Sequence, residues 1–218
     1  MVFNSNYIRK QLKSPAFSIF IILLFHISGR IGLQSSSREW FLALTPLNLL
    51  ISFIVLIRHE DYTSIRFILV TFSILFLGFF VEVIGVNTGL LFGQYSYGPV
   101  LGFKFFNTPL MIGFNWFIMV FCIGVVLNKL KITILFKSII GASIMTICDY
   151  IIEPVAIAYN FWSWAETKIP IQNYIAWYLF SFLFLLIFYY SKIEKTSKVA
   201  PWLLVIQIIF FLSLNLLI

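Results

Sequence analysis

Residues Asp149–Trp164 read DYIIEPVAIAYNFWSW and place two carboxylates inside a long apolar segment. Asp149 and Glu153 are four residues apart, about one turn of an α-helix, so a helix here carries both acids on one face. The surrounding sequence is apolar enough to span a membrane, where an ionisable side chain is costly and by default marks a functional site. Polar residues on the other apolar segments are therefore candidates to face this pair.

The composition of the chain is typical of a membrane protein. Of its 218 residues, 61% are hydrophobic, 19% are aromatic and only 11% are charged. A water-soluble domain of this length could not bury so much apolar surface, so we expect an all-α bundle. Because no polar linker divides the chain, we expect a single integral membrane domain over residues 1–218. Cys122 and Cys148 both fall in apolar segments, so we expect them to act as small apolar side chains and not as a disulfide or a redox pair.

Seven apolar segments are each about long enough to cross a hydrocarbon core ~30 Å thick. The expected spans are Ala16–Leu33, Trp40–Ile57, Phe67–Val86, Pro109–Leu127, Ile132–Ala158, Ile171–Tyr190 and Pro201–Ile218.

Charge supports the count of seven, because seven spans separate the basic residues of the connecting segments. The positive-inside rule then puts the N-terminus in the cytoplasm and the C-terminus outside, in a multi-pass protein of the cell (inner) membrane. The same rule explains the net charge of +7 without nucleic acid as a partner. The cytoplasmic set is Arg9, Lys10, Lys13, Arg58, Arg66, Lys129, Lys131, Lys137, Lys192, Lys195 and Lys198, against Arg38, Lys104 and Lys168 outside.

Counting residues from the cytoplasmic ends brings the unusual polar residues to one level. At about 1.5 Å per residue, Glu82, Arg30, Asp149 and Glu153 lie roughly 24, 26, 27 and 33 Å into their spans. Several spans thus predict one polar pocket in the outer half of the membrane. The same level holds Asn115, Trp116, Asn173 and Trp177, while Asn48 and His26 lie somewhat deeper and could form the floor.

The longest connection, Asn87–Thr108, lies on the same outer side. It holds four Gly and a Pro, so it does not continue the preceding helix. It is also too aromatic for a solvated loop, and we expect a lid or a re-entrant segment at the mouth of the bundle. Gly85, Gly89 and Gly93 are spaced by four, which fits either close backbone approach near the pocket or plain helix packing.

The candidate reactive groups are the carboxyls of Glu82, Asp149 and Glu153. A buried carboxyl with no cation beside it is expected to be protonated near neutrality, and such a group can act as a general acid. Aromatic rings around it can stabilise a carbocation through their faces. We expect the substrate to be bound by Arg30, Asn48, Tyr95, Tyr97, Asn115, Trp116, Trp162, Trp164 and Asn173.

Each of these residues also has a structural explanation. Arg30 could form an ion pair with Glu82 or Asp149, although three acids outnumber one arginine. The pair Glu153-Pro154 could simply end a helix. The Tyr and Trp residues could be anchors at the membrane interface, as we expect for Trp40 and Trp202.

Sequence motifs for metal and nucleotide chemistry are missing. There is no HExxH, no paired Cys/His spacing, and no Walker or Rossmann glycine motif. No aspartate-rich repeat offers a site for Mg²⁺ and diphosphate, and Pro201–Ile218 lacks the lysine of a retinal protein. The sequence therefore predicts no metal and no cofactor, and it favours acid catalysis on an apolar substrate.

Two blocks of residues resemble the membrane-integral carotenoid hydratase family, which includes bisanhydrobacterioruberin hydratases and 1',2'-hydratases of monocyclic carotenoids. The resemblance covers residues 40–190. Glu153 stands where the family has Asp before Pro, and Ala176 where it has Gly before Trp, so neither departure removes a chemical group. The first block is Glu82, Gly85, Thr88, Gly89, Phe92, Gly93, Gln94, Tyr95, Tyr97, Leu101, Gly102, Pro109 and Trp116. The second is Asp149, Glu153, Pro154, Trp162, Trp164, Pro170, Asn173 and Trp177.

The resemblance implies a hydro-lyase that acts in carotenoid (isoprenoid) biosynthesis. A protonated carboxyl, Asp149 or Glu153, would donate to the terminal C1=C2 alkene of an acyclic carotenoid, and water oriented by Glu82 would add to the tertiary cation. Two alternatives stay open. A small helical membrane lycopene cyclase would capture the same cation with an internal alkene, and a non-catalytic carotenoid- or lipid-binding protein would keep its acids as ion pairs. The other end of the substrate (lycopene, γ-carotene or a C50 chain) and the oligomeric state also stay open.

Overall fold

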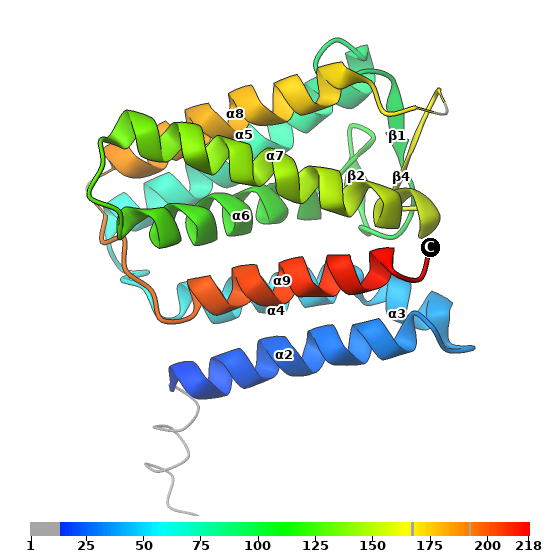
Figure 1. Ribbon diagram of the computed structural model, residues 1–218, viewed down its shortest axis with the longest axis horizontal. Coiled ribbons are helices and arrows are strands. Elements are labelled where there is room, and N and C mark those ends of the chain that lie inside the picture. The colour runs from blue at the N-terminus through cyan, green and yellow to red at the C-terminus, as the bar shows by residue number, and fades with distance from the viewer. Residues whose placement is uncertain (1–13, 167, 192) are drawn as a thin grey trace, which may run out of the picture.

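Helices that run side by side make up most of the structure, a computed structural model that describes residues 14–166, 168–191 and 193–218 (Figure 1). The helices are α2 Pro15–Gly32, α3 Arg38–Ala43, α4 Thr45–Ile57, α5 Ile65–Thr88, α6 Met111–Asn128, α7 Ile134–Ala158, α8 Ile171–Tyr190 and α9 Ala200–Asn215. Four short strands accompany them: β1 Tyr95–Tyr97, β2 Lys104–Phe105, β3 Thr108–Pro109 and β4 Trp162–Trp164.

Five of these helices, α2, α5, α6, α7 and α8, are long and apolar enough to cross a membrane. Helices α4 and α9 are apolar but shorter. Six of the seven expected spans coincide with one helix each, to within three residues at either end. The chain is therefore of the polytopic helical membrane class.

The expected second span, Trp40–Ile57, is wrong as a single helix. The structure divides it at Leu44 into α3 and α4. Pro46 lies in the first turn of α4, where its missing N–H costs nothing, whereas in the interior of a continuous helix it would remove a hydrogen bond. Sequence hydropathy does not register this break because both pieces are apolar.

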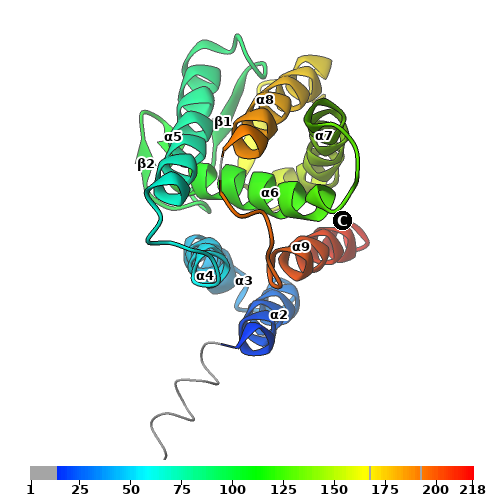
Figure 2. The same ribbon diagram turned by 90° about the vertical axis from the view of Figure 1, so that its left-hand side faces the viewer.

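Helix α6 is the centre of the bundle. All of its residues from Trp116 to Val125 are buried. Figure 2 shows it between α5, α7 and α8 on one side and α4 and α9 on the other, with α2 outermost. A Cβ atom on Gly78 of α5 would lie only 2.6 Å from the Cβ of Trp116, so glycine allows the close contact that sets Trp116 against α5.

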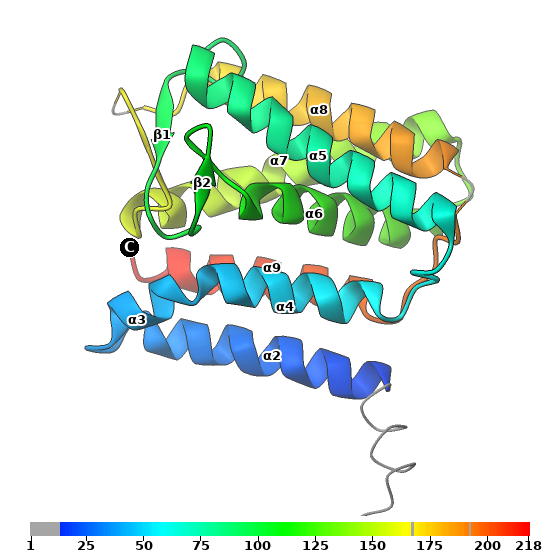
Figure 3. The same cartoon turned by 180° about the vertical axis from the view of Figure 1, so that it is seen from behind.

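The strands cap one end of the bundle, the end that also holds α3 and the C-terminus (Figure 3). Strand β1 pairs antiparallel with β4, and β2 pairs antiparallel with β3. The all-helical expectation is thus right for the bundle but misses these pairs. Each strand has two or three residues, too few for a period-two pattern to stand out. The pairing turns the segment Asn87–Thr108 into a folded cap.

The glycines of this segment do not form a helix-packing face. Helix α5 ends at Thr88, and Gly89 takes a left-handed conformation (φ 69°) that only glycine adopts at low cost. Gly93 also has a positive φ, and a Cβ on Gly85 would lie 2.4 Å from the ring of Phe92. The spacing of four therefore reflects close approach and tight turning beside the cap.

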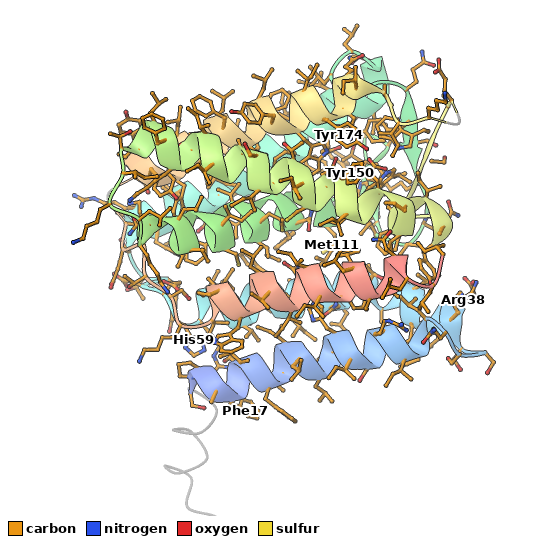
Figure 4. The ribbon with its side chains drawn as sticks, in the orientation of Figure 1. Phe17, Arg38, His59, Met111, Tyr150 and Tyr174 are labelled. Carbon is orange, nitrogen blue, oxygen red and sulfur yellow. The ribbon has the colours of Figure 1, made fainter. Side chains whose placement is uncertain are left out.

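The connections α4–α5, α6–α7 and α8–α9 lie at the opposite end of the bundle from the strands (Figure 1). Figure 4 marks the two ends by His59 and Arg38. The basic residues divide in the same way: Arg58, Arg66, Lys129, Lys131, Lys137, Lys195 and Lys198 belong to the end without strands. Arg9, Lys10, Lys13 and Lys192 lie outside the described residues.

Glu60 lies in the α4–α5 connection, at the end of the bundle without strands, and its pKa is shifted. Its Oε1 atom is buried and has no hydrogen-bond partner among the described residues. Burial raises the pKa of Glu60 to about 7, a hydrogen bond with Ser197 acts in the opposite direction, and the charge of nearby Glu194 adds to the rise. The folded protein therefore holds this proton more tightly than the unfolded chain does.

The stability of the protein should fall as the pH rises from about 4.5 through about 7, because the buried side chain must then carry a charge. Glu60→Gln removes this cost. We expect its melting temperature to exceed that of the wild type at pH 8 and to match it at pH 5. Since the side chain is partly exposed, the gain at pH 8 should be about 1 kcal/mol at most. Thermal melts of the detergent-solubilised protein would measure it, and an equal difference at both pH values would contradict the assignment.

Candidate active site

A cavity of about 490 Å³ lies at the strand end of the bundle. Its wall is largely apolar and contains the side chains of Glu82, Asp149 and Glu153. Leu24 and Trp40 also line it, yet they are 45% and 61% exposed, so the cavity reaches the outer surface beside α2 and α3. Of the residues expected from the sequence, it brings together Glu82, Asp149, Glu153, Asn48, Tyr95, Tyr97, Asn115, Trp162, Trp164 and Asn173, with His26 and Trp177.

Glu82 of α5 is held by three donors. The hydroxyls of Tyr95 and Tyr97 donate to its Oε2 at 2.5 and 2.7 Å, and Nε1 of Trp116 donates to Oε1 at 3.1 Å. Burial, and after it the negative charge of Glu82, raises the pKa of both tyrosines, so both phenols stay protonated. These three donors favour the ionised form of the carboxyl, whereas its burial favours the neutral form.

Asp149 and Glu153 share a donor. Nδ2 of Asn173 on α8 donates to Oδ2 of Asp149 at 2.9 Å and to Oε1 of Glu153 at 3.3 Å. Glu153 also accepts from Nε1 of Trp162 and of Trp164, both at 3.0 Å to Oε2. Within the described chain, Glu153 and Glu82 thus accept three hydrogen bonds each, and Asp149 accepts one.

Helix α7 carries both acids on its inner face, as their spacing of four predicts. Tyr150, the neighbour of Asp149, points away from the bundle, is 65% exposed and lies 5.9 Å from the ring of Tyr174 (Figure 4). The helix continues past Pro154 to Ala158. The pair Glu153-Pro154 therefore lies inside the helix and does not mark its end.

The β1–β4 pair supplies donors to both groups of acids. Tyr95 is paired with Trp164 and Tyr97 with Trp162, so the donors of Glu82 face the donors of Glu153 across the ladder. Their ring centroids are 5.2 and 6.1 Å apart. Alternation along a strand turns Ser96, between the two tyrosines, to the exposed side. Two three-residue strands thus fix four of the aromatic side chains expected in the pocket.

Two expected site residues lie elsewhere. Arg30 does not line the cavity; it donates to Oγ of Ser213 at 3.0 Å and to the side chain of Gln34. The suggested ion pair of Arg30 with Glu82 or Asp149 is therefore replaced by bonds to neutral groups. Trp116 is fully buried behind Glu82 and stacks on Trp177 at a centroid distance of 4.1 Å.

The sequence reasoning missed Gln207 of α9. Its side chain lines the cavity, is 8% exposed, and has an Oε1 atom with no partner among the described residues. Oδ1 of Asn48 is also buried without a hydrogen-bond partner among the described residues. An amide within a predominantly apolar span is the signal that singled out Asn48, and it would have found Gln207 as well.

The fold and the site define a class: a helical membrane protein whose buried acids converge on an apolar cavity. Residues 41–218 match the carotenoid biosynthesis protein family, and the chain belongs to this family. It is also similar to the bisanhydrobacterioruberin hydratase of Haloarcula japonica, with 29% identity over 122 residues, which are 50% of this chain and 40% of that protein. The chain thus matches less than half the length of this relative. No solved structure matches the chain.

Proposed function

We propose that this protein adds water to the terminal C1=C2 double bond of an acyclic carotenoid end group. The observation that carries the proposal is the convergence of three differently hydrogen-bonded carboxyls on one apolar cavity. An alkene offers no group for strong polar binding, so the reaction needs a proton donor held in a dry, ring-lined site. The family and the similarity to a hydratase support the same reaction class.

In this proposal Asp149 is the proton donor. Glu82 and Glu153 each accept at least one indole N–H, a group that can only donate, and both are therefore suited to remain carboxylates. Asp149 accepts only the amide of Asn173 within the described chain, which leaves an oxygen free to hold a proton. Since Asp149 and Glu153 bind one nitrogen atom, their charges are close, and the pair is expected to keep one proton.

The proposed chemistry balances without a cofactor. The π electrons of the alkene take the proton of Asp149 and form a C2–H bond, which leaves a tertiary cation at C1. Glu82, held as an anion by Tyr95, Tyr97 and Trp116, offsets this charge, and the faces of the cavity rings add to the effect. The oxygen of water then bonds to C1, and the water gives one proton back to Asp149. The product carries a 1-hydroxy end group.

The opening of the cavity suits a long substrate. Its volume of about 490 Å³ suits a drug-sized ligand rather than an entire polyene. In the proposal one end group enters between α2 and α3, past Leu24 and Trp40, and the rest of the chain stays in the bilayer. The acids then meet only the terminal alkene, and the far end of the substrate is left unspecified.

The proposed topology has seven crossings, with α4 and α9 beside the five long helices and the basic end in the cytoplasm. Cysteines placed at the exposed Ser96 and, as a control, at Lys131 would test it with a membrane-impermeant thiol reagent on intact cells. Cys122 and Cys148 are buried and contribute little background. Labelling at Ser96→Cys is expected, and labelling at Lys131→Cys instead would reverse the orientation.

Pigment analysis tests the function itself. The chain would be expressed in cells that accumulate lycopene, γ-carotene or an acyclic C50 carotenoid, and extracts would be compared by chromatography and mass spectrometry. A more polar product heavier by one water is expected. An isomer of unchanged mass would identify a cyclase, and pigment that co-purifies unchanged would identify a binding protein; either result would overturn the proposal.

A further inference from the structure

A second, much smaller cavity adjoins the first. It measures about 20 Å³, which is the room that one water molecule needs. Asn115 of α6 and Gln207 of α9 line both cavities, so the small chamber lies directly beside the space for the substrate. The rest of its wall is apolar or weakly polar, with Met119, Cys148 and Phe211 among the residues that close it.

One polar atom of this chamber is buried and lacks a partner. Oε1 of Gln207 is buried without a hydrogen bond inside the described chain, although the side chain is only 8% exposed. An unsatisfied buried acceptor is destabilising, and a water that donates to it would remove this cost. Two amides can supply the two or more polar partners that a buried water requires, because each has one acceptor and two donor hydrogens.

We infer that Asn115 and Gln207 bind the water molecule that is added to the carotenoid. This inference rests on the proposed function. It makes the two amides positioning residues for the nucleophile, whereas Asp149 supplies the proton. The water oxygen forms the C1–O bond, and one water proton goes to the carboxylate that Asp149 has become. The reason for a separate chamber is chemical: a cation in a largely apolar cavity reacts with the single water held beside it, and bulk water stays excluded.

Loss of this water should separate protonation from hydration. Without a nucleophile the cation at C1 returns to an alkene by losing a proton from C2 or from a C1 methyl group, or it is captured by an internal alkene. In D₂O Asp149 delivers a deuteron to C2. Loss of that same deuteron leaves the alkene unlabelled, whereas loss of the C2 proton or of a C1 methyl proton leaves deuterium in the alkene. Mass spectrometry of the recovered substrate therefore reports protonation independently of product.

The test uses two variants, Gln207→Met and Asn115→Leu, each similar in size to the native residue and without the amide. In D₂O we expect the hydrated product to fall at least 10-fold in both. Deuterium in the recovered alkene should be at least as high as in the wild type, because the cation that water no longer captures returns to alkene. Gln207→Glu, which keeps an oxygen at the same place, should restore part of the hydration.

Ser181→Ala is the matched control. Ser181 of α8 also has a buried oxygen with no partner among the described residues, but it lines neither cavity. It should leave hydration and deuterium uptake unchanged. Protein amount and melting temperature would be measured for every variant.

Three results would separate the possibilities. Hydration at the wild-type level in both Gln207→Met and Asn115→Leu would overturn the inference. Equal loss of hydration and deuterium uptake in stable protein would also overturn it, because the amides would then act before the cation forms. If the wild-type protein gives neither product nor deuterium uptake with any carotenoid, the proposed function itself fails.

Discussion

Replacing Asp149 by Asn should lower carotenoid hydration by roughly 10²–10⁴-fold, the usual contribution of a general acid. The amide has the same shape and can still accept the hydrogen bond from Nδ2 of Asn173. In the native protein this nitrogen lies 2.9 Å from Oδ2 of Asp149. The new amide cannot transfer a proton to an alkene. The loss should therefore appear in the rate of product formation, with little change in the amount or the melting temperature of the protein.

The same substitution at the other acids should give a different pattern. Glu82→Gln replaces one carboxyl oxygen by an NH₂ group, which then faces either the hydroxyls of Tyr95 and Tyr97 or Nε1 of Trp116, and so it should cost stability as well as activity. Asp61→Asn is the control, because Asp61 lies in the α4–α5 connection and its side chain accepts a hydrogen bond only from Thr63 among the described residues. Deuterium uptake in D₂O should vanish in Asp149→Asn. More than a tenth of wild-type hydration in this variant would show that another group donates the proton.

Replacing Gly98 by Ala should separate β1 from β4. The backbone N–H of Gly98 donates to the carbonyl of Phe161 at 2.8 Å, and an added Cβ would lie only 1.9 Å from the carbonyl oxygen of Asn160. That contact is impossible without movement of one backbone, which should cost about 1–3 kcal/mol. Because this ladder presents donors to both Glu82 and Glu153, the shift should also reduce activity at least 10-fold.

The measurement for Gly98→Ala is a thermal melt together with the hydration assay and the fluorescence of the tryptophans. Gly29→Ala provides the comparison, since a Cβ there would meet the ring of Phe210 at an ordinary 3.6 Å. It should melt within a degree or two of the wild type. Full activity of Gly98→Ala at an unchanged melting temperature would mean that the strand pair does not hold the acids in place.

Hydropathy was enough to predict six of the seven expected helices, and residue spacing predicted a common level for the polar residues, because the helical rise converts sequence distance into depth. The depth of a residue along a helix does not say whether its side chain points toward the pocket or away from it. Arg30 was for this reason placed in the pocket, although its guanidinium turns to Ser213, and Trp116 was placed on the wall, although it lies behind Glu82. Depth counting found the level of the site, and only packing decides which of its residues face inward.

The assignment of donors to acids was not predictable from the sequence. Tyr95 is separated from its strand partner Trp164 by two helices, α6 and α7, and each strand is three residues long. Nothing local indicates that Glu82 receives the tyrosines and Glu153 the tryptophans. This assignment depends on a single ladder register, and a shift of one strand by one residue would turn both of its rings away from the acids.

The position of α2 separates two roles within the molecule. Leu24, His26 and Gly29 of this outermost helix form part of the cavity wall, yet the three acids all belong to α5 and α7. The family match begins at residue 41 and so leaves α2 outside it. In the proposed route of entry, a substitution in α2 would change which molecules are admitted and leave the acids untouched. Substrate range and reaction type would then be set by different helices.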